Sequence, residues 1–146
     1  MKIRCQFFKK IAPFLVLLTF ETILFLVNYT QGTFLVGWDN LYPELNFAAN
    51  LKRNIFAVWQ EYRGLGLLDG MAHAANLPHT LFLWLLSLFF PLNLLRYIFI
   101  FLMHFLGGLG VFVLLKEWLF KNWPQKTPVS LAGALFYLLN LTTVQM

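Results

Sequence analysis

Five polar side chains occupy positions in the sequence where they could do chemistry. Asp39 is among the first polar residues after a long apolar segment, and Arg63 and Arg96 follow it. A carboxylate accepts a proton as a general base, and an arginine binds a phosphate through paired hydrogen bonds. Glu21 and His104 lie inside apolar segments, where an ionisable group is costly and needs a partner. What these residues do depends on the elements that hold them.

The composition predicts the class of these elements. Hydrophobic residues make up 60% of the 146 positions and charged residues only 12%, which is too few charges to cover an ordinary soluble surface. A helix needs roughly 20 apolar residues to cross the hydrocarbon core of a bilayer. We therefore predict an all-α, polytopic integral membrane protein with about three transmembrane helices in a single membrane domain.

The apolar segments and their interruptions set the predicted boundaries. Residues 81–115 admit either one short helix followed by one span, or two short spans that meet at Arg96. The second topology would place the lysines after residue 115 outside, against the positive-inside rule, so the first is favoured. The predicted order is a span at 11–36, an external loop at 37–80, a short re-entrant or interfacial helix at 81–90, a span at 91–115, a cytoplasmic loop at 116–127 and a span at 128–146.

Basic residues cluster at the ends of these predicted spans. Residues 1–10 carry four Lys or Arg and no acid, which predicts a cytoplasmic N-terminus. The net charge of +5 therefore indicates orientation in a membrane, and nucleic acid is not an expected partner. The last span has no polar anchor after it, which predicts an N-terminal portion of a longer protein. Membrane lipids and the remaining transmembrane helices of that protein are the expected partners.

The external loop is predicted to hold an interfacial helix followed by a glycine-rich turn. Apolar residues recur at helical spacing over residues 41–62. Residues 62–70 include three glycines and no helical pattern, so their backbone is suited to close approach by a ligand. Arg63 lies in this turn. Asp39 is either the N-cap of the interfacial helix, a role for which Asn40 competes, or a reactive carboxylate at headgroup level.

Glu21 and His104 are predicted to meet. At about 1.5 Å per residue, Glu21 is roughly 15 Å in from the cytoplasmic end of its span and His104 roughly 18 Å in from the end of the other. Two interpretations follow from this similar depth. The pair is either a hydrogen bond that holds two helices in register, or part of a proton relay or ligand site.

A set of short motifs keeps a recognisable order around the loop. The motifs are Trp59, Tyr62-Arg63-Gly64-Leu65-Gly66 with Gly70, Pro91-Leu92-Asn93-Leu94-Leu95, His104 with Gly108-Leu109-Gly110, and Gly133-Ala134-Leu135-Phe136-Tyr137. In this order and spacing, residues 30–146 resemble the N-terminal part of the YfhO-like bacterial membrane proteins. These belong with the GT-C superfamily of polyprenyl-phosphate-dependent glycosyltransferases.

The resemblance implies many transmembrane helices, a large first external loop and an acidic residue after the first span that serves the reaction. By position this residue is Asp39, as the base that activates the acceptor or as a ligand of a divalent metal. The implied activity transfers a sugar from a lipid-linked, polyprenyl-phosphate donor to a cell-envelope glycan or lipid acceptor. It takes place at the external face of the bacterial inner membrane. By their location, Arg63 and Arg96 either bind the donor phosphate or anchor the chain to lipid headgroups.

Two other functions are open from the sequence. The first is a polytopic transporter or lipid flippase, in which the loop is a gate and Glu21 and His104 belong to the pathway. The second is a non-catalytic membrane scaffold. The cofactor is unknown, and a divalent metal is the one candidate.

Overall fold

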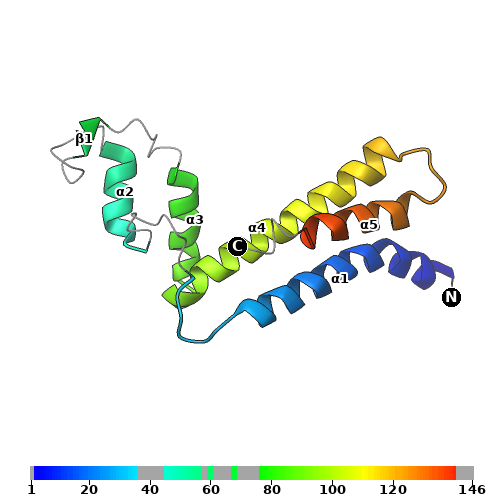
Figure 1. Cartoon of the computed structure of the whole chain (residues 1–146), viewed down its shortest axis with the longest axis horizontal. Coiled ribbons are helices and arrows are strands. Elements are labelled where there is room, and N and C mark those ends of the chain that lie inside the picture. The colour runs from blue at the N-terminus through cyan, green and yellow to red at the C-terminus, as the bar shows by residue number, and fades with distance from the viewer. Residues whose placement is uncertain (1, 36–44, 57–58, 61–66, 69–75, 141–146) are drawn as a thin grey trace. The chain divides into compact units, whose positions relative to one another are not determined.

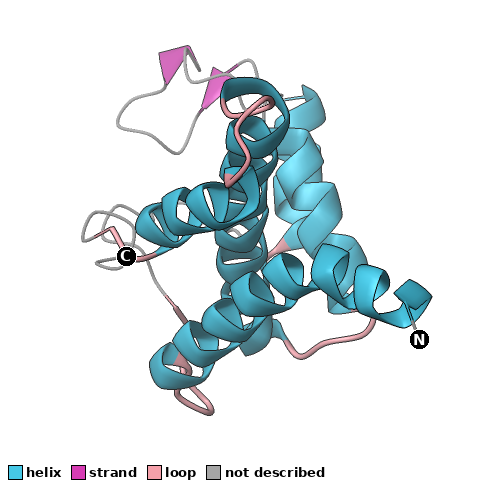
Figure 2. Ribbon diagram, turned by 90° about the vertical axis from the view of Figure 1, so that its right-hand side faces the viewer, coloured by secondary structure: helices cyan, strands magenta, loops and turns pink. Residues whose placement is uncertain are grey.

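Helices make up most of the computed structural model, which describes residues 2–35, 45–56, 59–60, 67–68 and 76–140. This confirms the predicted all-α class, to which the described residues add one pair of two-residue strands (Figure 2). The chain divides into a helical unit, residues 1–31 with 97–146, and a loop unit, residues 32–96 (Figure 1).

Helix α1, Lys2–Asn28, ends earlier than the sequence predicts. Its apolar part, Ile11–Asn28, is long enough to cross a membrane, but the predicted span at 11–36 is wrong at its C-terminal end. Gly32 has a φ of 78°, in the left-handed region that glycine adopts without steric cost. This backbone geometry is incompatible with a continuing helix, so the apolar residues after Gly32 do not lengthen α1.

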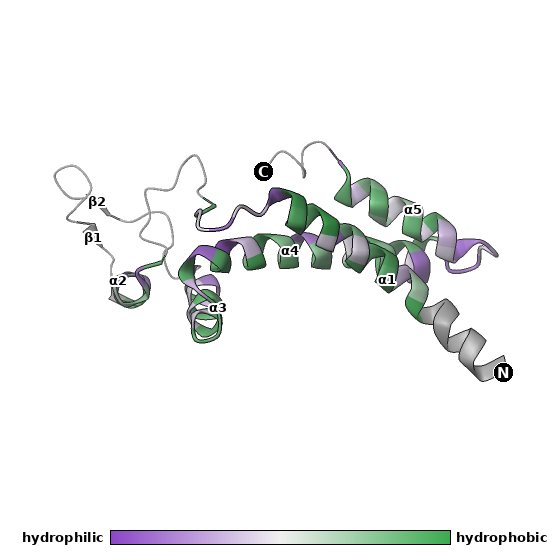
Figure 3. Ribbon diagram, turned by 90° about the horizontal axis from the view of Figure 1, so that it is seen from below, coloured by the Kyte–Doolittle hydropathy of each residue, from purple (hydrophilic) through white to green (hydrophobic). Residues whose placement is uncertain are grey.

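Helix α4, Leu92–Leu114, is continuous through Arg96 and is extended by one π-helical turn, η2, at Leu115–Leu119. Together these 28 residues are the second stretch, among the described residues, that is long and apolar enough to cross a membrane. Figure 3 shows apolar residues along both α1 and α4. Of the two topologies left open for residues 81–115, the structure has the one without a break at Arg96.

Helix α3, Leu77–Ser87, is the short helix expected before this long one. Its eleven residues rise about 16 Å, well under the roughly 30 Å of a bilayer core. The helix begins four residues before the predicted start at 81, because Pro78 stands in its first turn, where a missing N–H costs nothing.

Helix α5, Lys126–Leu138, covers the start of the predicted third span. Its 13 residues rise about 20 Å, and residues 141–146 of the prediction lie outside the described part of the chain. A third span therefore stays a prediction. The predicted loop at 116–127 is shorter than expected, because η2 and α5 take residues from both of its ends.

The helical unit has an apolar core to which α1, α4 and α5 each contribute a face. Its buried members are Leu17, Phe105, Phe112, Ala134 and Leu138. Small residues let α4 and α5 approach closely. A Cβ built on Gly107 would lie 2.5 Å from the Tyr137 hydroxyl, and one on Gly108 would lie 2.6 Å from Leu138. A Cβ on Gly110 would have no such neighbour within 4 Å in the described structure.

The loop unit holds helix α2, Phe47–Phe56, and two short strands. The side-chain oxygen of Asn46 accepts a hydrogen bond from the Ala49 amide at 3.2 Å, which caps the helix at its N-terminus. The predicted helix over 41–62 is thus too long at both ends. Strand β1, Trp59–Gln60, pairs antiparallel with β2, Leu67–Leu68, so the helical pattern does not continue through Trp59.

Helices α2 and α3 pack against each other within the loop unit. The Asn54 side-chain amide donates a buried hydrogen bond of 3.0 Å to the Thr80 hydroxyl. Because a buried polar group without a partner is costly, this bond fixes the register of the two helices.

Candidate functional site

Arg96 links the start of α4 to the chain that leads toward Asp39. Its Nη1 donates a hydrogen bond of 2.9 Å to the Leu35 carbonyl, across 61 residues of sequence. The side chain is half-buried. A guanidinium is always charged in proteins, so this bond fixes a cation close to the end of the described N-terminal segment.

Asp39 and Arg63, the predicted base and the second predicted phosphate ligand, lie outside the described residues. The structure still decides one alternative for Asp39. Helix α2 begins at Phe47 and is capped by Asn46, so neither Asp39 nor Asn40 is the N-cap of this helix. Capping this helix was the structural alternative to a catalytic role for Asp39, and Asn46 is the residue that caps it.

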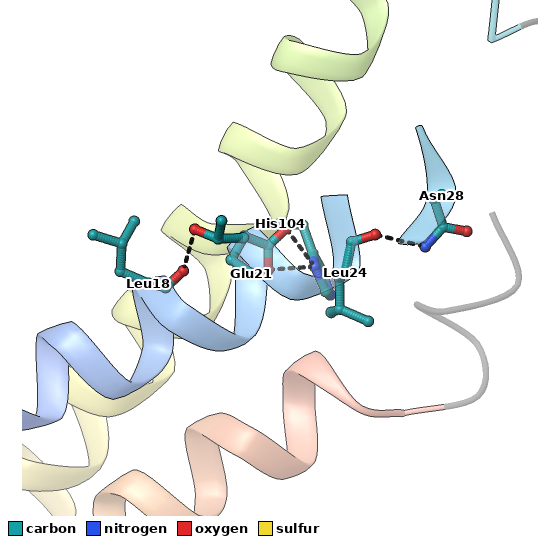
Figure 4. Close-up of polar contacts among 6 residues, drawn as sticks. Leu18, Glu21, Leu24, Asn28 and His104 are labelled. Carbon is teal, nitrogen blue, oxygen red and sulfur yellow. Dashed lines mark hydrogen bonds and ion pairs between the residues drawn. The ribbon is translucent and has the colours of Figure 1, made fainter. Parts of the chain in front are cut away.

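Glu21 and His104 are in contact in the helical unit, where α1 lies beside α4. His104 Nδ1 is 3.1 Å from Oε1 and 3.0 Å from Oε2 of Glu21, and both side chains are largely buried (Figure 4). A nitrogen placed almost equally between two carboxylate oxygens suits an Nδ1–H that donates to an ionised carboxylate. The two residues are 83 positions apart in sequence.

The other polar side chains near Glu21 on α1 bond within their own helix. The Thr19 and Thr22 hydroxyls donate to the carbonyls four residues earlier, at 2.8 and 2.7 Å. The Asn28 amide donates to the Leu24 carbonyl at 2.8 Å (Figure 4). Such local bonds satisfy short polar side chains where water is absent. Glu21 instead bonds to another helix, so among these residues it is the one that ties α1 to α4.

The second nitrogen of His104 adds a feature that the sequence did not predict. Nε2 is buried and has no hydrogen-bond partner in the described part of the chain. The ring of Tyr137 on α5 stacks on the imidazole, with 6.0 Å between centroids. Nothing in the sequence spacing links Tyr137 to His104, since the close approach depends on Gly107 one turn further along α4.

Leucine at either position of the pair is expected to destabilise the helical unit. Glu21→Leu or His104→Leu leaves a buried polar partner unsatisfied, so each should cost about 1–3 kcal/mol. The double variant should cost less than the sum, because no orphaned group remains. The measurement is unfolding in mixed SDS micelles, followed by circular dichroism.

Thr22→Val is the matched control, since its hydroxyl bonds only within α1. It should change stability by less than about 0.5 kcal/mol and add independently to His104→Leu. Strict additivity between Glu21→Leu and His104→Leu would contradict a stabilising contact between the two residues.

The site has no metal cluster in the part that the structure describes, where no group of three or more His, Cys, Asp or Glu side chains lies together. Comparison of the chain with protein-family models, with curated proteins and with solved structures finds no match. The arguments for function therefore depend on the residues and their geometry.

Proposed function

We propose that the chain is a multi-pass protein of a bacterial inner membrane, with its N-terminus in the cytoplasm. Two observations support this proposal. Both α1 and α4 with η2 contain stretches that are long and apolar enough to cross a membrane. These helices also leave large apolar side chains exposed, among them Leu26 at 64% and Leu114 at 58%, which lipid would cover. The basic residues 1–10 give the orientation.

We propose further that the loop unit carries part of a glycosyltransferase site of GT-C type. The substrate would be a sugar on a polyprenyl phosphate, and the acceptor a glycan or lipid of the cell envelope at the external face. Its partners would be this lipid-linked donor and the surrounding lipids. The motif resemblance set out above supplies the reaction class, and the geometry of Arg96 supplies the main physical support.

The hydrogen bond from Arg96 to the Leu35 carbonyl is the observation that carries this proposal. Asp39 follows Leu35 by four positions, and an extended chain spans at most about 3.6 Å per residue. Covalent geometry therefore keeps the Cα of Asp39 within about 14 Å of the Cα of Leu35. This bound is compatible with an acceptor hydroxyl at Asp39 and a donor phosphate at Arg96 that belong to one site.

In the proposed step, the Asp39 carboxylate accepts the proton of the acceptor hydroxyl, and the hydroxyl oxygen forms a bond to the anomeric carbon of the donor. The bond between that carbon and the phosphate oxygen breaks. The lipid phosphate leaves with the electron pair. A guanidinium beside the phosphate stabilises the developing negative charge, a role assigned to Arg96 and Arg63.

Arg96→Gln is expected to lower the rate of sugar transfer by about 10²-fold, because the cation beside the leaving phosphate is lost. Arg96→Lys keeps the charge and should retain more activity, although lysine cannot bind a phosphate in the bidentate manner of arginine. The measurement is transfer from polyprenyl-phosphate donors in proteoliposomes, at several donor concentrations.

Lys121→Gln is the control for the Arg96 series, since it removes an exposed cation of the helical unit. It should leave the transfer rate unchanged. Equal rates for Arg96→Gln and the unaltered protein would contradict the phosphate-binding role.

The buried contact between Glu21 and His104 favours a second candidate, a transporter or lipid flippase in which this pair exchanges protons. The two candidates differ in what happens to a lipid-linked sugar. A transferase cleaves the bond between sugar and phosphate, whereas a flippase moves the intact lipid across the bilayer. Movement of intact donor without cleavage would support the second candidate over the first.

A further inference from the structure

Helix α3 has one face that the described structure leaves uncovered. Its exposed residues are Leu81, Trp84, Leu85 and Leu88, which recur at spacings of three and four and therefore share one side of the helix. Phe89 and Phe90 continue the exposed apolar surface beyond its end, with Phe89 81% exposed. The helix contains no charged residue, and Figure 3 shows its apolar colouring.

The other side of α3 is already occupied. Thr80 and Leu83 are buried, and Thr80 bonds to Asn54 of α2. Helix α2 therefore covers the face opposite to the exposed one, and the orientation of α3 about its own axis is fixed within the loop unit. The apolar face needs another covering, because an exposed patch of this size in water is unfavourable.

We propose that the exposed face of α3 lies in the headgroup layer of the bilayer that α4 crosses. This inference rests on the proposed membrane location but not on the proposed enzyme activity. Residues 32–96 carry four acidic and four basic side chains and so no net charge, and the apolar face itself is what suits this layer.

The chain itself limits how far α3 is from the membrane. Four residues, 88–91, lie between its last residue, Ser87, and Leu92, where the apolar helix α4 begins. The five steps from Cα to Cα, at about 3.6 Å each, reach at most about 18 Å. If α4 crosses the bilayer, the end of α3 must stay at the surface of that bilayer. Trp84 suits this depth, since tryptophan favours the interface between water and lipid.

The test uses nitroxide spin labels in the full chain, reconstituted in phosphatidylcholine vesicles. Cys5→Ser removes the single native thiol. Labels then go at Leu85→Cys and Leu88→Cys on the exposed face, at Ser87→Cys as the half-buried control, and at Leu106→Cys on α4 as the lipid-facing reference. A label in lipid collides often with oxygen, which dissolves in the bilayer. A label in water collides often with a soluble nickel complex.

The expected result is a ratio of oxygen to nickel collisions at Leu85→Cys and Leu88→Cys that exceeds the ratio at Ser87→Cys and approaches that at Leu106→Cys. Brominated lipids should also quench the tryptophan fluorescence of the unlabelled protein more than that of Trp84→Phe, which checks the result without labels.

Three outcomes would overturn the proposal. Frequent nickel collisions on α3 with a lipid signal at Leu106→Cys would place this face in water while the membrane location holds. If the labels on α3 collide rarely with both oxygen and nickel, then protein, such as a second copy of the chain, covers this face. Frequent nickel collisions at Leu106→Cys as well would reject the membrane location together with this inference.

Discussion

Asp39→Asn is expected to reduce sugar transfer by about 10²–10⁴-fold, the usual contribution of a positioned general base. Asparagine has nearly the same size but cannot accept the proton of an acceptor hydroxyl. The loss should appear in the maximal rate more than in the apparent affinity for the donor, because the carboxylate acts on the acceptor. The measurement is transfer of labelled sugar from a panel of polyprenyl-phosphate donors in proteoliposomes.

Asn40→Ala is the matched control, since it alters the neighbouring polar residue and leaves the carboxylate in place. It should retain transfer within about threefold, which corresponds to roughly 0.7 kcal/mol of barrier. Undiminished transfer by Asp39→Asn would reject the assignment of the base. If the unaltered protein transfers no sugar from any donor, the enzyme proposal itself fails.

Gly108→Ala is expected to destabilise the helical unit by about 1–3 kcal/mol. The added methyl group would lie 2.6 Å from Cδ2 and 2.8 Å from Cγ of Leu138, and Leu138 is fully buried in the core. The leucine cannot turn away without displacing its own neighbours, so α4 and α5 must separate.

Gly110→Ala, in the same helix, is expected to stabilise the helical unit. No atom of the described structure lies within 4 Å of its added Cβ, and alanine is favoured over glycine in a helix interior by about 0.5–1 kcal/mol. The two variants should shift the unfolding midpoint in mixed SDS micelles in opposite directions. Shifts of the same sign and size would show that α4 and α5 do not pack as described.

Hydropathy predicts the helices of this chain better than their ends. The length of the apolar run and the position of Pro91 are enough to predict a short α3 followed by a long α4. The end of α1 was missed because apolar residues continue beyond Gly32, and hydropathy does not encode a positive φ. The start of α2 has a usable signal, since asparagine is a preferred N-cap and Asn46 stands directly before the helix, but the apolar spacing over residues 41–62 extends past it.

The part of the candidate site that could be predicted is the pair of ionisable side chains in the apolar helices, because each requires a polar partner. Glu21 and His104 are costly inside apolar helices, and counting residues from the helix ends gives them similar depth, so the contact follows from the sequence. The bond from Arg96 to the Leu35 carbonyl has no such signal, because every residue carries a backbone carbonyl. The stacking of Tyr137 on His104 depends on how closely α5 approaches α4, which is a property of the folded unit.

The separation of 83 positions between Glu21 and His104 has a consequence for biosynthesis. At a translation rate of about 5–20 residues per second, roughly 4–17 s pass between the synthesis of the carboxylate and that of its imidazole partner. Asn54 and Thr80 are only 26 positions apart, so the second member of this pair is made sooner after the first. Asn54 and Thr80 can therefore pair before His104 is made, and during that interval Glu21 depends on groups other than His104 for its hydrogen bonds.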